Sequence, residues 1–313
     1  MMNTSKKVLL LCGAAVLAAA LTAGAVFGWK AHRRSQAMEE AGIWQAGGHW
    51  GEALDHGGDA ANAKRFTDKL ATLKNDYLSA DNQVYCAVIP DKGFYLQNEG
   101  APKADYEGLF ATVQSGLAES GIQYIDLTAA LNADRYYTTD SHWMQPELQP
   151  VMDALGSAMD FSADLSALTP NVSEHFAGAY GKYGAKAQDT LTWLTGPAID
   201  SAVVEDFQHP EIKTVYDTAR LTTDVPYDLF LSGATPLVTI TSPEARTDKE
   251  LVIFRDSFGS SIAPLFLEEY SKVTLVDIRY MVSALLPQYV EFTDQDVLFL
   301  YSALVVDQSM ILR

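Results

Sequence analysis

Residues 251–261 read Leu-Val-Ile-Phe-Arg-Asp-Ser-Phe-Gly-Ser-Ser. The apolar run at 251–254 is typical of a buried strand, and the apolar-periodic residues at 262–270 predict a helix. Ser257 therefore stands in the turn between a strand and a helix. Backbone N–H groups at the start of a helix point outward and favour negative charge there. Acyl transfer requires donors of this kind because its tetrahedral intermediate carries an oxyanion.

The segments on either side alternate between strand and helix patterns. We expect strands at 84–89, 122–126, 236–241, 273–277 and 296–301, and helices at 60–77, 106–120 and 146–159. This alternation predicts an α/β fold in which helices cover both faces of a mostly parallel sheet. Active sites in such folds lie beyond the carboxyl ends of the strands, which is where Ser257 falls. Residues 160–235 break the alternation, and we expect them to form an insertion that shapes the cleft.

A second motif, Asp140-Ser141-His142-Trp143, supplies the other groups that a serine nucleophile needs. Residues i and i+2 of an extended segment point to the same side, so we expect Asp140 and His142 to face one site while Ser141 points away. The histidine would take the serine proton, and the carboxylate would orient the histidine. Two plainer interpretations stay open. In the first, Ser257, Ser260 or Asp256 caps a helix, and in the second, His142 is an inert surface residue.

In this order, the two motifs resemble the DHHW-motif family, which is related to the SGNH-hydrolase-like O-acetyltransferases of the alginate type. Other segments fit the same resemblance across residues 60–313, namely 85–92, 176–183, 227–236 and 276–280. The resemblance implies an SGNH-like three-layer α/β/α sandwich with a mostly parallel sheet. It also implies that Ser257 is the nucleophile, His142 the general base and Asp140 the orienting acid.

The sequence departs from that family pattern at two positions. Ser141 stands where the name-giving motif has a histidine, on the side expected to face away from Ser257. Where relatives tend to read Gly-Gly-Asn, this chain reads Ser-Gly-Ala, ending at Ala234. Loss of one oxyanion donor costs about 3 kcal/mol of transition-state stabilisation in other enzymes. We therefore expect backbone groups near Phe258 and Gly233 to hold the oxyanion or the substrate.

Two further side chains are candidates for substrate contacts. Tyr180 belongs to an aromatic group of the kind that stacks on sugar rings, although local packing is the commoner role of such residues. Arg279 follows a predicted strand, where it would contact an anionic substrate or form a surface ion pair.

The N-terminus predicts a membrane anchor. Residues 8–29 carry no charged side chain and would span about 33 Å as a helix, against a hydrocarbon core of about 30 Å. We expect a signal-anchor at 1–34 and a linker at 35–59. A cleaved signal peptide is the alternative, because residues 23–25 read Ala-Gly-Ala. The basic residues after the span favour an inward C-terminal side, whereas the family resemblance implies an extracytoplasmic domain.

The composition excludes several classes of partner. The net charge is −18, all 40 acidic residues follow position 38, and five of the 22 basic residues precede position 35. Such a surface repels phosphate, so nucleic acid is not an expected partner and membrane contact is expected only through the N-terminus. The two cysteines, Cys12 and Cys86, are not expected to pair. The sequence shows neither metal-ligand spacing nor a glycine-rich phosphate loop, so we expect no metal and no cofactor.

These features and the resemblance together predict a membrane-anchored enzyme, or a secreted one if the segment is cleaved. It would add acetyl groups to an extracellular or cell-envelope polysaccharide, or remove them. The resemblance also implies a multi-pass membrane acyltransferase as partner. The alternative is a non-catalytic glycan-binding or assembly subunit on the same fold, suggested by Ala234 and Ser141. A general lipase or protease is disfavoured because no Gly-x-Ser-x-Gly elbow occurs.

Overall fold

The computed structural model describes residues 32–186 and 188–313. The chain divides into two compact units, residues 1–43 and the rest of the chain. The described part of the first unit contains a helix at residues 32–40. Nowhere in the described chain is a helix both long and apolar enough to cross a membrane. The predicted span at 8–29, and with it the choice between anchor and cleaved signal, lies outside the described residues.

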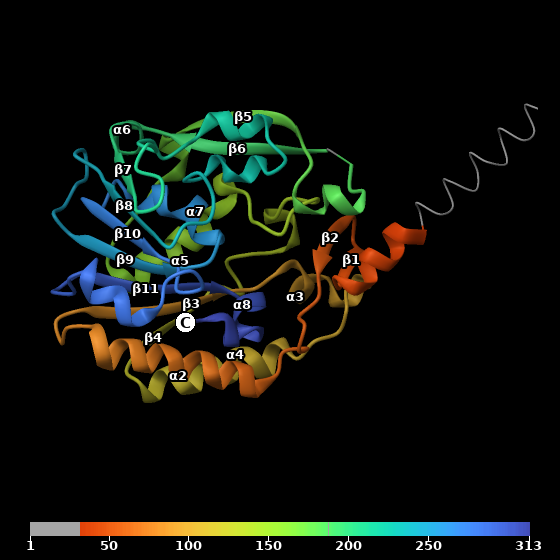
Figure 1. The fold of residues 1–313 in the computed structure, drawn as a ribbon, viewed down its shortest axis with the longest axis horizontal. Coiled ribbons are helices and arrows are strands. Elements are labelled where there is room, and N and C mark those ends of the chain that lie inside the picture. The colour runs from red at the N-terminus through yellow and green to blue at the C-terminus, as the bar shows by residue number, and fades with distance from the viewer. Residues whose placement is uncertain (1–31, 187) are drawn as a thin grey trace, which may run out of the picture. The chain divides into compact units, whose positions relative to one another are not determined.

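A seven-stranded sheet forms the centre of the second unit (Figure 1). In spatial order its strands are β4 (Gln123–Asp126), β3 (Gln83–Ile89), β11 (Asp296–Ser302), β9 (Glu250–Arg255), β10 (Lys272–Val276), β8 (Leu237–Thr241) and β7 (Val203–Asp206). The strands from β4 to β10 in this order run parallel. β8 pairs antiparallel with β10, and β7 pairs antiparallel with β8. The sheet is therefore mixed, with its antiparallel pairs at one edge.

Helices pack against both sides of this sheet. They are α2 (Ala60–Tyr77), α3 (Lys92–Leu96), α4 (Tyr106–Glu119), α5 (Gln149–Met159), α6 (Pro197–Asp200), α7 (Phe258–Ile262) and α8 (Ala303–Asp307). Along β11, Val297 and Phe299 belong to the same core as the buried residues of α2 and α4, whereas Leu298 and Leu300 belong to the same core as those of α5. Successive side chains of a strand face opposite ways, so a strand buried on both faces must be apolar throughout. The result is a mixed α/β fold.

The range predicted as a linker, 35–59, is more ordered than its composition indicated. It contains the strands β1 (Ile43–Ala46) and β2 (His49–Glu52), which form a small two-stranded sheet. Gly47 and Gly48 connect them with φ of 55° and 83°. Two-residue turns of this kind need positive φ at both positions, and glycine adopts it without steric cost. The glycines that suggested a flexible tract therefore form a specific turn.

The predicted insertion, 160–235, has two structural parts. The strands β5 (Thr169–Phe176) and β6 (Asp189–Thr195) form a separate antiparallel sheet. Strand β7 lies in the same range but joins the edge of the main sheet through β8. The range therefore adds an edge strand to the fold as well as walls to the cavity described below.

The helix predicted at 262–270 begins earlier and is shorter than expected. α7 covers five residues from Phe258 and is followed by the 3₁₀ segment η8 (Ala263–Phe266). Its start is fixed by Asp256, whose Oδ1 accepts the Phe258 N–H at 3.0 Å. A helix this short has a small dipole, so it does not provide the anion-favouring field that the sequence pattern suggested.

Candidate active site

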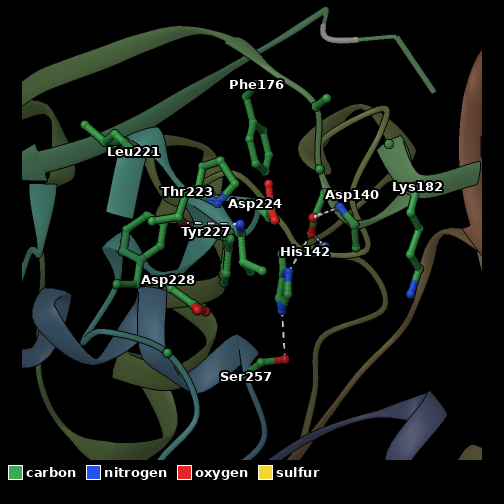
Figure 2. Close-up of a pocket in the computed structure, with 18 of the residues that line it drawn as sticks. Asp140, His142, Phe176, Lys182, Leu221, Thr223, Asp224, Tyr227, Asp228 and Ser257 are labelled. Carbon is green, nitrogen blue, oxygen red and sulfur yellow. Dashed lines mark hydrogen bonds and ion pairs between the residues drawn. The ribbon is translucent and has the colours of Figure 1, made fainter. Parts of the chain in front are cut away.

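Asp140, His142 and Ser257 form a continuous chain of hydrogen bonds (Figure 2). His142 Nδ1 lies 2.6 Å from Asp140 Oδ1, and His142 Nε2 lies 2.8 Å from Ser257 Oγ. The carboxylate favours the tautomer with its proton on Nδ1, which leaves Nε2 to accept the serine hydroxyl. The Ser257 side chain makes no helix-capping bond, and the His142 side chain is only 12% exposed. Neither plainer interpretation therefore describes Ser257 or His142, whereas Asp256 does cap the helix, as the first interpretation allowed.

The environment of Asp140 keeps its carboxylate ionised. Burial opposes ionisation, but the adjacent His142 and the hydrogen bonds that the carboxylate accepts lower the pKa of Asp140 to about 2. Its Oδ1 accepts the His142 N–H at 3.0 Å, and its Oδ2 accepts the Ala179 N–H at 2.6 Å. A Cβ on Gly178 would lie 2.2 Å from the Asp140 Cβ, so only glycine allows this approach. A charged Asp140 can stabilise the imidazolium that forms when His142 accepts a proton.

Ser141 points away from the hydrogen-bonded chain, as the i, i+2 spacing predicts. Together with Lys92 and Tyr180, it lines a separate small cavity. Because position 141 faces away from the site, a serine there in place of the family's histidine does not disturb the contact between His142 and Ser257.

The turn that carries Asp140 is held from two sides. Lys92 is 2% exposed, and its Nζ donates to the carbonyl oxygens of Tyr137 and Asp140, both at 2.8 Å. Burial lowers the pKa of Lys92 to about 8, although nearby carboxylates act in the opposite direction. From strand β2, the Trp50 N–H donates to the Thr138 carbonyl at 2.8 Å. A lysine that follows the end of a predicted strand is usually a surface residue or a substrate contact, so the sequence did not reveal this positioning role.

Ser261 connects the two sequence motifs. Its Oγ accepts the Trp143 Nε1–H and the Tyr227 hydroxyl, both at 2.8 Å, and donates to the Phe258 carbonyl at 3.2 Å. All four residues are buried. A buried network in which each polar group has a partner specifies one arrangement, so it fixes the His142 turn relative to the Ser257 turn.

Tyr227 also stacks directly on His142. Their ring centroids lie 3.7 Å apart with an interplanar angle of 10° (Figure 2). One sequence signal pointed to Tyr227, because it opens the 227–236 segment of the family resemblance. Its contact with His142 depends on a distant loop, and no local pattern predicts such a contact.

Two backbone N–H groups that were predicted to bind the oxyanion or the substrate already donate hydrogen bonds within the protein. The Phe258 N–H donates to Asp256 Oδ1, and the Gly233 N–H donates to the Phe230 carbonyl at 3.3 Å. Gly233 and Ala234 nevertheless line the cavity that contains the hydrogen-bonded chain. The expected role of the Phe258 amide as an oxyanion donor is therefore not supported by the geometry.

Arg279 and Tyr180 lie outside the cavity wall, contrary to expectation. The Arg279 Nε and Nη2 donate to the two carboxylate oxygens of Asp277, at 2.9 and 2.6 Å. Tyr180 is 3% exposed, and its ring centroid lies 5.4 Å from Lys92 Nζ. Arg279 therefore forms an ion pair and Tyr180 packs inside the protein, which are the alternatives to a substrate contact that the sequence left open.

A cavity of about 890 Å³ opens beside Ser257 and His142. Its walls come mainly from residues 175–185 and 221–234, within the predicted insertion (Figure 2). No group of His, Cys, Asp and Glu side chains in the described part of the chain is arranged to hold a metal ion.

Comparisons with known proteins agree with the fold described above. No family model matches this sequence, and no curated protein matches it. Among solved structures, a DHHW family protein from Eubacterium siraeum has a TM-score of 0.70 at 21% identity, covering 84% of this chain and 91% of that one. Bacillus cereus PatB1 with a sulfonyl adduct has a TM-score of 0.63 at 15% identity, with coverages of 84% and 95%. The O-acetyltransferase domain of Pseudomonas putida AlgJ has a TM-score of 0.50 at 10% identity, with coverages of 85% and 92%. The resemblance predicted from the motifs is therefore confirmed at the level of the fold.

Proposed function

We propose that this protein is an acyl-transfer enzyme that moves acetyl groups onto or off the hydroxyls of an extracellular or cell-envelope polysaccharide. The observation that carries the proposal is the hydrogen-bonded chain from Asp140 through His142 to Ser257, at the edge of a cavity large enough for a sugar. The fold supports it, because an O-acetyltransferase domain shares that fold. PatB1 also supports it, since sulfonyl reagents react with activated nucleophiles and its structure carries a sulfonyl adduct.

In the proposed reaction, Ser257 Oγ attacks the carbonyl carbon of an acetyl ester. A C–O bond forms, His142 Nε2 takes the serine proton, and the carbonyl oxygen becomes an oxyanion. Collapse of this intermediate breaks the ester C–O bond, and His142 returns the proton to the departing alkoxide. Asp140 stabilises the imidazolium between these two events.

The second half of the reaction repeats these steps with a new nucleophile. A sugar hydroxyl or water attacks the acetyl-serine while His142 takes its proton. His142 then protonates Ser257 Oγ as the acetyl group leaves. Attack by a sugar gives transfer and attack by water gives hydrolysis, so the balance depends on how well an acceptor excludes water from the cavity.

The oxyanion would be held by backbone groups. We assign this role to the N–H groups of Ser257 and Ala234, because the Phe258 N–H already donates to Asp256. Ala234 has no side-chain amide to add a donor. A single oxyanion donor is worth a factor of about 10²–10³ in rate elsewhere, so we expect a slow enzyme.

The proposal includes the location of the protein and one partner. The apolar segment at 8–29 would anchor the chain in the cell membrane, with an SGNH-like three-layer domain at 60–313 outside the cytoplasm. A multi-pass membrane acyltransferase would supply the acetyl groups. One observation favours a second candidate, a non-catalytic glycan-binding or assembly subunit, and that observation is the alanine at position 234.

Hydrolysis of p-nitrophenyl acetate by the full chain in detergent tests the proposal. We expect Ser257→Ala and His142→Ala each to lower kcat/KM by a factor of about 10³ or more. Ser141→Ala is the matched control, because this serine belongs to the same motif but faces away from the site, and it should stay within about threefold. Adding oligosaccharide acceptors then separates transfer from hydrolysis. If the wild type were no faster than either variant, the binding-subunit alternative would replace the enzyme.

A further inference from the structure

Asp228 lies beside the reacting groups but takes no part in the hydrogen-bonded chain. It belongs to the 3₁₀ segment η7 (Pro226–Leu229) and directly follows Tyr227, the residue that stacks on His142. It lines the same cavity as Ser257, and Figure 2 shows its carboxylate extending into the space near His142 and Ser257. Any substrate that reaches Ser257 therefore passes close to this carboxylate.

The neighbouring backbone is shaped around the Asp228 side chain. A Cβ on Gly233 would lie 2.8 Å from both Asp228 Cγ and Oδ1, so a side chain there would displace the carboxylate. Gly233 has φ of 97°, and the two preceding residues, Leu231 and Ser232, have φ of 55° and 57°. Bulky residues such as leucine rarely adopt this conformation, and strained backbone of this kind clusters at functional sites.

The Asp228 carboxylate has no hydrogen-bond or ion-pair partner among the described residues. Arg220, the cation with the largest effect on this carboxylate, instead contacts Asp217 with Nε at 3.1 Å. Burial raises the pKa of Asp228, while the charges of Arg220 and His142 act in the opposite direction. A half-buried carboxylate without a partner in the protein is available to accept hydrogen bonds from whatever fills the cavity, whether water or a ligand.

The other charges of the cavity do not neutralise this carboxylate. Asp224 lies on the same wall, whereas Lys182 comes from the other wall, and its Nζ lies 5.0 Å from the Tyr183 ring (Figure 2). The side of the cavity next to Ser257 is therefore acidic.

We propose that Asp228 is a specificity-determining residue that accepts a hydrogen bond from a sugar hydroxyl or ammonium group and disfavours a sugar carboxylate. The substrate class is then a neutral or amino-sugar glycan rather than a polyuronate. This inference rests on the proposed function, because it concerns the substrate of the same site. Two like charges about 6 Å apart at an effective dielectric near 20 repel strongly enough to give a discrimination of about tenfold or more.

The test compares three acetyl esters that differ in charge. They are p-nitrophenyl acetate, which is neutral, 4-acetoxybenzoate, which is anionic, and 4-acetoxybenzyltrimethylammonium, which is cationic. The readout is the ratio of kcat/KM for the anionic ester to that for the cationic ester, measured on the full chain in detergent. Because the ratio is compared between variants, differences in leaving-group chemistry cancel. We expect Asp228→Asn to raise this ratio about tenfold and Asp228→Lys to raise it further.

Asp248→Asn is the matched control. It removes the same unit charge from an exposed position before strand β9, at the opposite end of that strand from Ser257. Its ratio should equal that of the wild type. If Ser257-dependent hydrolysis occurs but Asp228→Asn leaves the ratio unchanged, Asp228 has no role in selection and the enzyme proposal stands. If Ser257→Ala hydrolyses all three esters as fast as the wild type, the enzyme proposal fails and this inference fails with it.

Discussion

Replacement of Lys92 by methionine tests how the Asp140 turn is held. The substitution keeps the length and apolar stem of the side chain but removes the donor to the Tyr137 and Asp140 carbonyls. Each buried carbonyl left without a partner costs about 1–3 kcal/mol. The fall of the Lys92 pKa from 10.5 to about 8 offsets part of that cost, because burial disfavours the charged form by about 3 kcal/mol. The two carbonyls together cost about 4 kcal/mol in the middle of that range, so we expect a net loss of about 1 kcal/mol in the free energy of unfolding at pH 7.

The pH dependence of this loss has a definite sign. Folding lowers the pKa of Lys92, so between about 8 and 10.5 the unfolded chain holds a proton that the folded protein has released. The wild type therefore gains stability as pH rises through this window, and the methionine variant does not. Between pH 7 and pH 9.5, the difference in the free energy of unfolding between the two proteins should grow by about 2 kcal/mol.

Urea denaturation at the two pH values, followed by tryptophan fluorescence, measures this difference. Lys74→Met is the matched control, since Lys74 Nζ also donates to two carbonyls, those of Ser120 and Gly121 at 2.9 and 2.8 Å, but near the surface. Its loss should be about 1 kcal/mol or less and should not affect esterase activity. Lys92→Met should also lower kcat/KM by about tenfold or more through a displaced His142. A stability difference that is equal at both pH values, or smaller at pH 9.5, would refute this reasoning.

Four further predictions concern the contacts of His142 and Ser261. Tyr227→Phe keeps the ring that stacks on His142 and should lower kcat/KM only a few-fold. Tyr227→Leu removes the ring and should lower kcat/KM by about tenfold or more. Equal effects of the two variants would show that the ring is not needed. Asp140→Asn should reduce kcat by a factor of about 10⁴ with little change in KM, and a KM effect alone would contradict the role of Asp140 as the orienting acid. The folded protein lowers the pKa of Asp140 to about 2. The stabilisation that the ionised carboxylate contributes should therefore be complete above about pH 4 and be lost as pH falls towards 2. The acid unfolding midpoint of Asp140→Asn, which lacks this carboxylate, should differ from that of the wild type. Trp143→Phe removes the donor to Ser261 and should reduce the free energy of unfolding by about 2 kcal/mol, as measured by urea denaturation, with no loss expected if that bond is not formed.

The main sheet was predictable because its signals are local. The run at 251–254, which lies inside strand β9, is apolar throughout, and that pattern is typical of a strand buried on both faces. The placement of Ser257 at the carboxyl end of this strand then follows from connectivity alone. The pairing of Asp140 with His142 follows from the two-residue repeat of an extended chain. These predictions required no knowledge of contacts between distant segments.

The contacts that position the site depend on distant segments and could not be predicted locally. Lys92 looks like a surface residue until the 137–140 turn covers it, and Tyr227 meets His142 only because an insertion folds back over the cavity. The Phe258 amide was expected to be free, although an aspartate before a helical run often caps it, and Asp256 does so here. Gly47 and Gly48 suggested flexibility, since the same residue type serves both linkers and tight turns.

The proposed function requires that Ser257 is a nucleophile activated by His142. Intact-mass spectrometry after treatment with phenylmethanesulfonyl fluoride, followed by peptide mapping, tests this requirement. We expect one sulfonyl adduct on Ser257 in the wild type, none on Ser257→Ala, and labelling of His142→Ala slower by a factor of about 10² or more. Absence of an adduct on the wild type, or equal labelling of the wild type and His142→Ala, would contradict it.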